Sequence, residues 1–186
     1  MRWLPLVLLA GCGVSEPGLS VHVTLQVGAP LSAQAASLAI EEVELVPCAV
    51  ARPWWQALSP VSTAFAHGVE AANATPRRRV SPVLLDLTVA EAQDVAHFAP
   101  PPGALCAVKL TFAPSTADAR AQGTTLFLEQ PSVRQVSTKR YVVTKAFEAR
   151  ALDEGARELE FSLRLEAGQG ADGDETLRVL LGTLAL

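Results

Sequence analysis

Cys12 is the first residue of the chain whose side chain could take part in covalent chemistry, and it stands directly behind an apolar run. The run covers residues 3–10, and one positive charge, Arg2, precedes it. Such a run is too short to span a bilayer, for which roughly 20 residues are needed, but it is long enough for the core of an export signal. We therefore expect residues 1–11 to be a signal peptide that is cleaved rather than folded.

The tetrapeptide at residues 9–12, Leu-Ala-Gly-Cys, resembles the lipobox of bacterial lipoproteins. In that motif, small residues fit the signal peptidase, and the cysteine sulfur receives a diacylglyceryl group before cleavage. The resemblance implies that Cys12 becomes the first residue of a lipoprotein, and that its acyl chains, palmitate among them, hold the protein on a membrane. Gly13, the residue directly after this cysteine, then favours sorting of the lipoprotein to the outer membrane. An ordinary uncleaved secretory signal and a buried N-terminal strand are the alternatives.

The other two cysteines, Cys48 and Cys106, each lie within or at the end of an apolar run typical of a β-strand. If Cys12 carries lipid, these two remain in a compartment where disulfides form, and we expect them to pair. Closing a loop of about 59 residues would stabilise the fold by roughly 4 kcal/mol in the chain-entropy model. Two buried free thiols are the alternative. The sequence has no Cys-x-x-Cys motif, so a bond here would be structural rather than redox-active.

Residues 49–81 form a long irregular segment, and long loops in compact domains are often functional. Trp54 and Trp55 follow a proline and could stack on sugar rings or on a partner protein. The arginines Arg77, Arg78 and Arg79 could pair with phosphate or carboxylate groups of envelope glycans. These five residues are our candidate binding loop. One tryptophan packed under the loop, and arginines that are merely solvated, are the alternatives.

Enzyme motifs are missing from the sequence. It contains no Gly-x-Ser-x-Gly, His-Glu-x-x-His, Ser-x-x-Lys or P-loop pattern. Gly168, Gly170 and Gly173 match the dinucleotide fingerprint as a string, but we expect a hairpin loop between strands there. The carboxylates in and after this loop, Asp172, Asp174 and Glu175, are too few for the roughly six to eight oxygens that calcium takes. We expect no enzyme activity and no cofactor.

The composition limits the partners. The 186 residues carry a formal net charge of −4, which argues against nucleic acid. The length suits a single domain, which we place at residues 21–186 behind a lipidated tether at residues 12–20. The histidines, His22, His67 and His97, are far apart in the sequence, so we expect no metal cluster, and His22 should lie on the solvent-exposed face of its strand.

Several segments have the period-two alternation of half-buried strands. The clearest is 157–166, in which Leu159, Phe161, Leu163 and Leu165 belong to the core. Glu41 and Glu42 are expected to form a β-bulge, and a capping box from Thr88 to Glu91 predicts a short helix. We predict an all-β fold, an antiparallel β-sandwich of about eight strands with one short crossover helix. The other expected strands are 21–27, 37–46, 82–87, 105–112, 124–129, 139–147 and 176–186.

A family resemblance emerges between residues 37 and 112. A strand ending in Val43-Glu44-Leu45 is followed by Leu84-Leu85-Asp86-Leu87 and by a Pro102-Gly103 turn that leads into a further strand. This order resembles bacterial envelope lipoproteins whose domain of unknown function is a transthyretin-like or carboxypeptidase-regulatory-like β-sandwich. The resemblance implies the fold and says almost nothing about activity. A weaker similarity, to the periplasmic copper protein found with methanobactin genes, implies histidine and modified tryptophan ligands.

From these observations we expect a lipid-anchored protein of the bacterial cell envelope with a non-enzymatic binding or structural role. Its partner would be an envelope protein or a glycan, met at the segment that carries Trp54 and Trp55. The alternative is a periplasmic protein that binds a metal such as copper.

Overall fold

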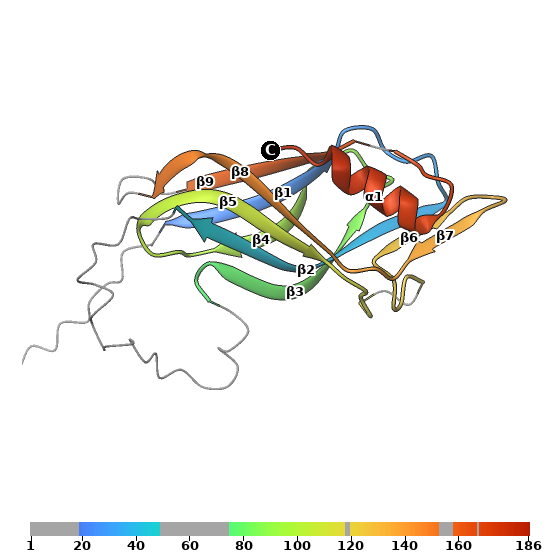
Figure 1. Ribbon diagram of the computed structural model, residues 1–186, viewed down its shortest axis with the longest axis horizontal. Helices are drawn as coiled ribbons and strands as arrows, with labels where there is room; N and C mark the ends of the chain where they lie inside the picture. The colour runs from blue at the N-terminus through green and yellow to red at the C-terminus, as the bar shows by residue number, and fades with distance from the viewer. Residues whose placement is uncertain (1–18, 49–74, 118–119, 153–157, 167) are drawn as a thin grey trace, which may run out of the picture.

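Two β-sheets packed face to face make up the body of the molecule, and a single helix covers one end (Figure 1). The computed structural model describes residues 19–48, 75–117, 120–152, 158–166 and 168–186. Within these residues the chain forms nine strands and one α-helix. The expectation of an all-β sandwich with a short helix is confirmed.

The smaller sheet has three strands in the order β4-β1-β9. Its centre is β1 (Ser20–Val27), which pairs antiparallel with β4 (Gln93–Phe98) and parallel with β9 (Glu158–Leu165). Because side chains alternate across a strand, one face of β1 is fully buried while the other reaches solvent. This parallel pair departs from the predicted antiparallel arrangement, because the sheet joins the beginning of the described chain to a strand near its end.

The larger sheet is built around one long strand, β2 (Ala35–Pro47). Along one edge β2 pairs with β3, and along the other its first residues pair with β6 and the later ones with β5. Since β8 pairs with β5 and β7 pairs with β6, these four strands form one long hairpin, interrupted by an excursion at residues 113–125. The bounds are β3 Arg78–Asp86, β5 Gly103–Phe112, β6 Leu126–Glu129, β7 Arg134–Ser137 and β8 Tyr141–Leu152.

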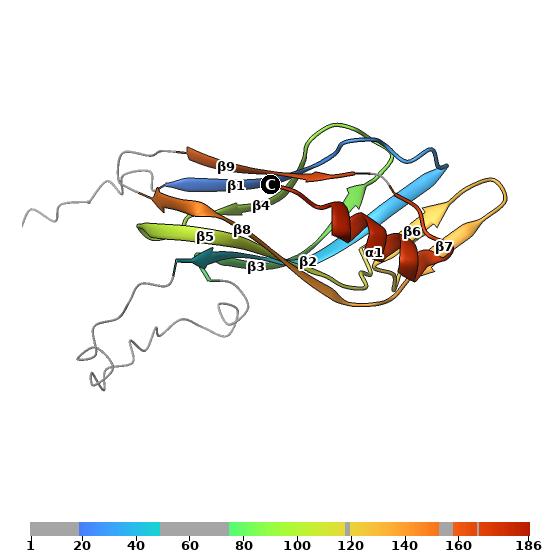
Figure 2. The same ribbon diagram turned by 45° about the horizontal axis from the view of Figure 1, so that its top comes forward.

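The core lies between the two layers, which Figure 2 shows nearly edge-on. Phe112 of the larger sheet and Phe161 of the smaller one are among its largest fully buried side chains. The expected core positions of β9 are confirmed for Phe161, Leu163 and Leu165, whereas Leu159 is only partly buried. The register of β2 shifts between Ile40 and Glu42 against both neighbours, which confirms the predicted bulge.

The short helix predicted from Thr88 is wrong. Asp86 Oδ1 accepts hydrogen bonds from both the amide and the hydroxyl of Thr88, and the side chain of Gln93 bonds the amide and the carbonyl of Asp86. These side-chain bonds close a turn in place of a helical N-cap. The chain then continues as β4, a strand that the sequence pattern did not predict.

The strand expected at residues 176–186 is also wrong, because this segment forms the helix α1 (Gly173–Thr183). Its buried side chains recur every three or four residues, at Thr176, Leu177, Leu180 and Leu181, as the helical period requires. The helix follows β9 at the end of the chain and crosses over no pair of strands. The described part of the chain contains no helix of the length and apolar character that would cross a membrane.

Candidate functional site

Four of the residues singled out in the sequence lie outside the described part of the structure. They are Cys12, the expected lipid attachment site, His67, and the two tryptophans of the candidate binding loop, Trp54 and Trp55. The described residues on either side of the segment that carries the two tryptophans are Cys48 and Thr75. Both belong to the end of the sandwich where β1 begins, because Cys48 continues β2 and Thr75 bridges to Arg78 at the start of β3.

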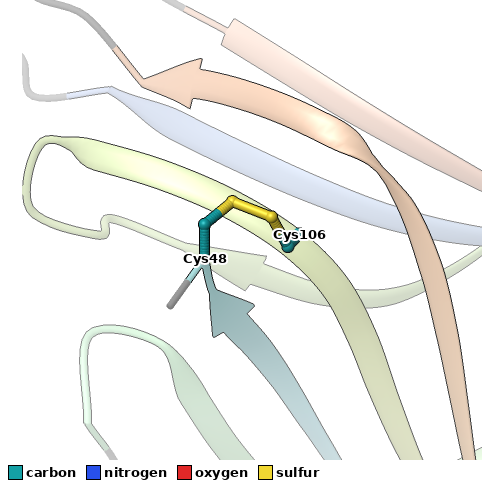
Figure 3. Close-up of a disulfide and its surroundings, with 2 residues drawn as sticks. All are labelled: Cys48 and Cys106. Carbon is teal, nitrogen blue, oxygen red and sulfur yellow. A yellow bond between two sulfur atoms is a disulfide. The ribbon is translucent and has the colours of Figure 1, made fainter. Parts of the chain in front are cut away.

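The predicted disulfide is present. Cys48 and Cys106 are bonded, with their Cα atoms 4.8 Å apart (Figure 3). The Cys48 amide also donates to the carbonyl oxygen of Ala104, which holds the end of β2 against β5. Cys106 sits where β5 slips in register against both of its neighbours. The bond therefore joins adjacent strands of one sheet and fixes the edge from which residues 49–74 depart.

The three arginines do not come together as one anion-binding cluster. Arg78 and Arg79 lie in β3, so the irregular segment expected at residues 49–81 ends sooner than predicted. Arg78 donates from Nε and Nη2 to the carboxylate of Glu42, whereas Arg79 Nε donates to the carbonyl oxygen of His97. Arg77 Nη2 reaches the carbonyl oxygen of Pro101 at 3.5 Å. Each guanidinium therefore has a partner within the protein.

The pair of Glu42 and Arg78 is the most nearly buried ion pair of the described residues, since only 8% of the Glu42 side chain is exposed. Hydrogen bonding to Arg78 holds the pKa of the Glu42 carboxyl below its usual range, and the same bond raises the pKa of Arg78. Both groups stay charged at neutral pH. The pair ties β3 to β2 next to the bulge, and it commits two of the nitrogen donors of Arg78 to a partner within the protein.

The glycine-rich segment before α1 differs from the expected hairpin loop, because it connects a strand to a helix. The free amides at the N-terminus of this helix are nevertheless bonded by carboxylates of the protein itself. Asp172 caps the helix by accepting from the amide of Glu175, and the Glu175 carboxylate accepts from the amide of Ala171. Negative charge at the first turn stabilises the helix and would repel a pyrophosphate. A Cβ at Gly170 or Gly173 would meet backbone atoms, so these glycines serve packing.

Asp174 links the helix to the larger sheet. Its carboxylate accepts from the hydroxyl of the buried Ser137 at 2.7 Å and pairs with Lys139 Nζ at 2.8 Å. Hydrogen bonds from Lys139 and Ser137 lower the pKa of Asp174, and the carboxylate in turn raises the pKa of Lys139. Lys139 stays charged in this pairing, and Ser137 is only 2% exposed and out of reach of a solute, so this trio is a structural clamp.

Two histidines that are far apart in the sequence face each other on the outer side of the smaller sheet. His22 of β1 and His97 of β4 are register partners, and their ring centroids are 4.2 Å apart at an interplanar angle of 78°. Sequence reasoning missed this pair because only the antiparallel pairing of β1 with β4 brings the two residues together. The prediction that His22 lies on the outer face of its strand holds, since 27% of its side chain is exposed, and 53% of the His97 side chain is exposed as well.

A cavity of about 310 Å³ lies over the junction of β2, β3 and β6. Gln34, Ser37 and Asp86 line it together with Arg120 and Phe127. Phe127 is only 3% exposed, and the Arg134 guanidinium stands 5.0 Å from the centre of its ring. The cavity therefore offers no open aromatic face on which a sugar could stack.

No protein-family model, curated protein or solved structure matches this chain.

Proposed function

We propose that this chain is a lipoprotein of the bacterial cell envelope, held on the outer membrane through Cys12, and that its β-sandwich has a non-enzymatic binding or structural role. The observation that carries the proposal is the disulfide between Cys48 and Cys106. Disulfides persist in oxidising compartments and are rare in the bacterial cytoplasm, so the bond supports export. It also uses two of the three cysteines and leaves Cys12, behind its apolar run, for the lipid.

The position of Ser20 supports a membrane-proximal binding surface. Ser20 opens β1, and the chain from an anchored Cys12 to Ser20 can span no more than roughly 28 Å. The end of β2 and the start of β3, next to which Cys48 and Thr75 flank the segment that carries Trp54 and Trp55, lie at this same end (Figure 1). A partner that met this segment would therefore be close to the membrane, as an envelope protein or a glycan layer is.

Intact mass and membrane fractionation test the anchor. The wild-type chain should begin at Cys12, carry the added mass of several acyl chains and sediment with membranes. The Cys12→Ser variant should lack that mass and move to the soluble fraction, while keeping the disulfide. A wild-type chain that is soluble and unmodified would overturn the proposal. A Cys48→Ser variant is the matched control, because losing a different cysteine should not release the protein from the membrane.

Cosedimentation with isolated peptidoglycan and with vesicles of outer-membrane lipid tests the binding role. Replacing Trp54 and Trp55 by alanine should reduce binding if these rings contact the partner. Val133→Ala is a suitable control, since Val133 is an exposed apolar side chain in the β6–β7 turn at the far end of the sandwich. Unchanged binding by a folded tryptophan variant would remove this segment from the proposal.

A periplasmic metal-binding protein, with copper as the expected metal, is the second candidate function. The observation that favours it is the juxtaposition of His22 and His97. Elemental analysis of the purified chain separates the two candidates, because a binding module of the first kind should contain no stoichiometric metal.

A further inference from the structure

A row of polar side chains crosses the outer face of the smaller sheet. His22 lies between His97 on β4 and Glu160 on β9, which are its register partners on the two sides. Neighbouring positions on such a sheet place Cβ atoms roughly 4.5–5.5 Å apart, within reach of one bound ion. Both imidazoles are partly exposed, so a solute can approach them without opening the core.

The charges around the two rings favour a cation. His22 Nε2 is 3.5 Å from a carboxylate oxygen of Glu158, and His97 Nε2 is 3.7 Å from one of Asp94. Glu160 adds a third carboxylate to the same face. Arg79 also reaches His97, but its Nε is held by the backbone carbonyl oxygen of that residue.

Imidazole nitrogen is the preferred ligand of borderline divalent transition metals, whereas magnesium and calcium prefer oxygen. We propose that His22 and His97 together bind one divalent transition-metal ion of this class, with water and the exposed carboxylate of Glu158 completing its coordination. In the part of the chain that the structure describes, no three histidine, cysteine or acidic side chains are already assembled around a metal position. The site is therefore a two-imidazole chelate rather than a closed structural cage.

The separation of the rings suits such a chelate. A metal–nitrogen bond of about 2.0–2.1 Å places two imidazole rings on one ion with centres roughly 4.5–5.2 Å apart at tetragonal or tetrahedral angles. The present distance of 4.2 Å is within about 1 Å of this range. The Nε2 atoms of the two rings now face different carboxylates, so both rings must turn until one nitrogen of each meets at the ion, which partly exposed side chains allow. His22 Nε2 now contacts the hydroxyl of Ser20 at 2.9 Å, a contact that a metal at this nitrogen would replace.

This inference goes beyond the membrane-anchored role, because it depends on neither Cys12 nor residues 49–74. It gives the second candidate function a specific site. Failure to bind metal would leave the fractionation result with Cys12→Ser untouched, and a soluble chain could still bind metal at His22 and His97. The two proposals therefore fail independently.

Isothermal titration of the full chain with Cu²⁺, Zn²⁺ and Ni²⁺ tests the proposal. We expect one ion per chain, with Cu²⁺ bound most tightly, as the Irving–Williams order requires. His22→Gln and His97→Gln should each weaken Cu²⁺ binding by at least about tenfold, because each removes one arm of the chelate, and the double variant should be little worse than either. His67→Gln is the matched control that should keep the wild-type affinity, because it removes a histidine that is not part of the proposed chelate.

Equal affinity of the wild type and the two histidine variants would overturn the assignment, as would a loss caused by His67→Gln alone. A paramagnetic measurement protects the test against variants that fail to fold. Substoichiometric Cu²⁺ added to the labelled wild-type chain should broaden the amide resonances of His22, His97 and Glu158 before others. Broadening that starts elsewhere would show that the metal binds another part of the chain.

Discussion

Arg78 holds the carboxylate of Glu42 with two parallel hydrogen bonds, from Nε to Oε1 and from Nη2 to Oε2, each 2.7 Å long. The contact joins residues 36 apart in the sequence, at the point where the bulge disturbs the register of β2 and β3. Backbone pairing is irregular there, so this two-pronged contact secures the strand that leads out of residues 49–74. Its removal has measurable consequences.

Arg78→Ala should lower the free energy of unfolding, because it leaves the nearly buried Glu42 carboxylate without its main partner. Urea denaturation followed by tryptophan fluorescence and by circular dichroism measures the change. Lys109→Ala is the matched control, since Lys109 pairs with the more exposed Glu44 on the same sheet and should cost less. A larger effect of Lys109→Ala than of Arg78→Ala would contradict the importance of the Glu42 pair.

Stability should fall in acid through the same carboxylate. Because Arg78 holds the pKa of folded Glu42 below its ordinary value of 4.5, the pair contributes fully above pH 4.5 and loses its contribution as pH falls through the folded pKa. At neutral pH, Glu42→Gln should therefore be less stable than the wild type, and the difference should shrink below pH 4.5. Thermal unfolding across this range measures it. A difference that is constant down to strong acid would show that the charge of Glu42 is not responsible.

Reduction of the Cys48–Cys106 bond should destabilise the chain by about 4 kcal/mol in the chain-entropy model, given the long loop that it closes. The double variant Cys48→Ser, Cys106→Ser should match the reduced wild type in urea denaturation. Added reductant should leave this double variant unchanged. If reductant shifts its midpoint as much as that of the wild type, the effect does not come from this disulfide.

Two glycines of α1 should respond oppositely to alanine. A Cβ at Gly173 would run into the backbone of Val136, so Gly173→Ala should destabilise the chain by roughly 1–3 kcal/mol through overpacking. A Cβ at Gly182 meets nothing within 4 Å, and Gly182→Ala should stabilise the helix by about 0.5–1 kcal/mol. Thermal melting of both variants gives the sign directly. Two shifts of the same sign would contradict the docking of α1 on β7.

Strands that are half buried could be predicted from the sequence because alternation alone reports on them. β1 and β9 follow this alternation. The bulge of β2 could be predicted from an interruption of it, because the apolar spacing slips by one residue at Glu41 and Glu42. The pairing of Cys48 with Cys106 could be predicted from cysteine arithmetic combined with the expected compartment. In each case the signal is either a local pattern of apolar residues or the number of cysteines in the chain.

The errors arose where short apolar runs fit more than one period. Val95, Ala96 and Phe98 of β4 are all buried, an uneven spacing that matches a helix turn as well as a strand. Residues 176–186 have the opposite problem, since their leucines suggest a strand although Leu177, Leu180, Leu181 and Leu184 follow a helical spacing. The cap at Asp172 and the acidic first turn would have indicated the helix. The contact of His22 with His97 could not be predicted, because it depends on strand register.

The parallel pairing of β1 with β9 also governs the order in which the molecule can fold. Thr24 and Ser162 are neighbours in this sheet but are 138 residues apart in the sequence. One edge of β1 therefore has no strand to pair with until β9 has been made or released. Contacts of such long range slow folding, because the loop must close before any pairing stabilises it. We therefore expect the smaller sheet to form last. A chain that leaves a translocation channel N-terminus first would remain incompletely folded until residues 158–165 emerge.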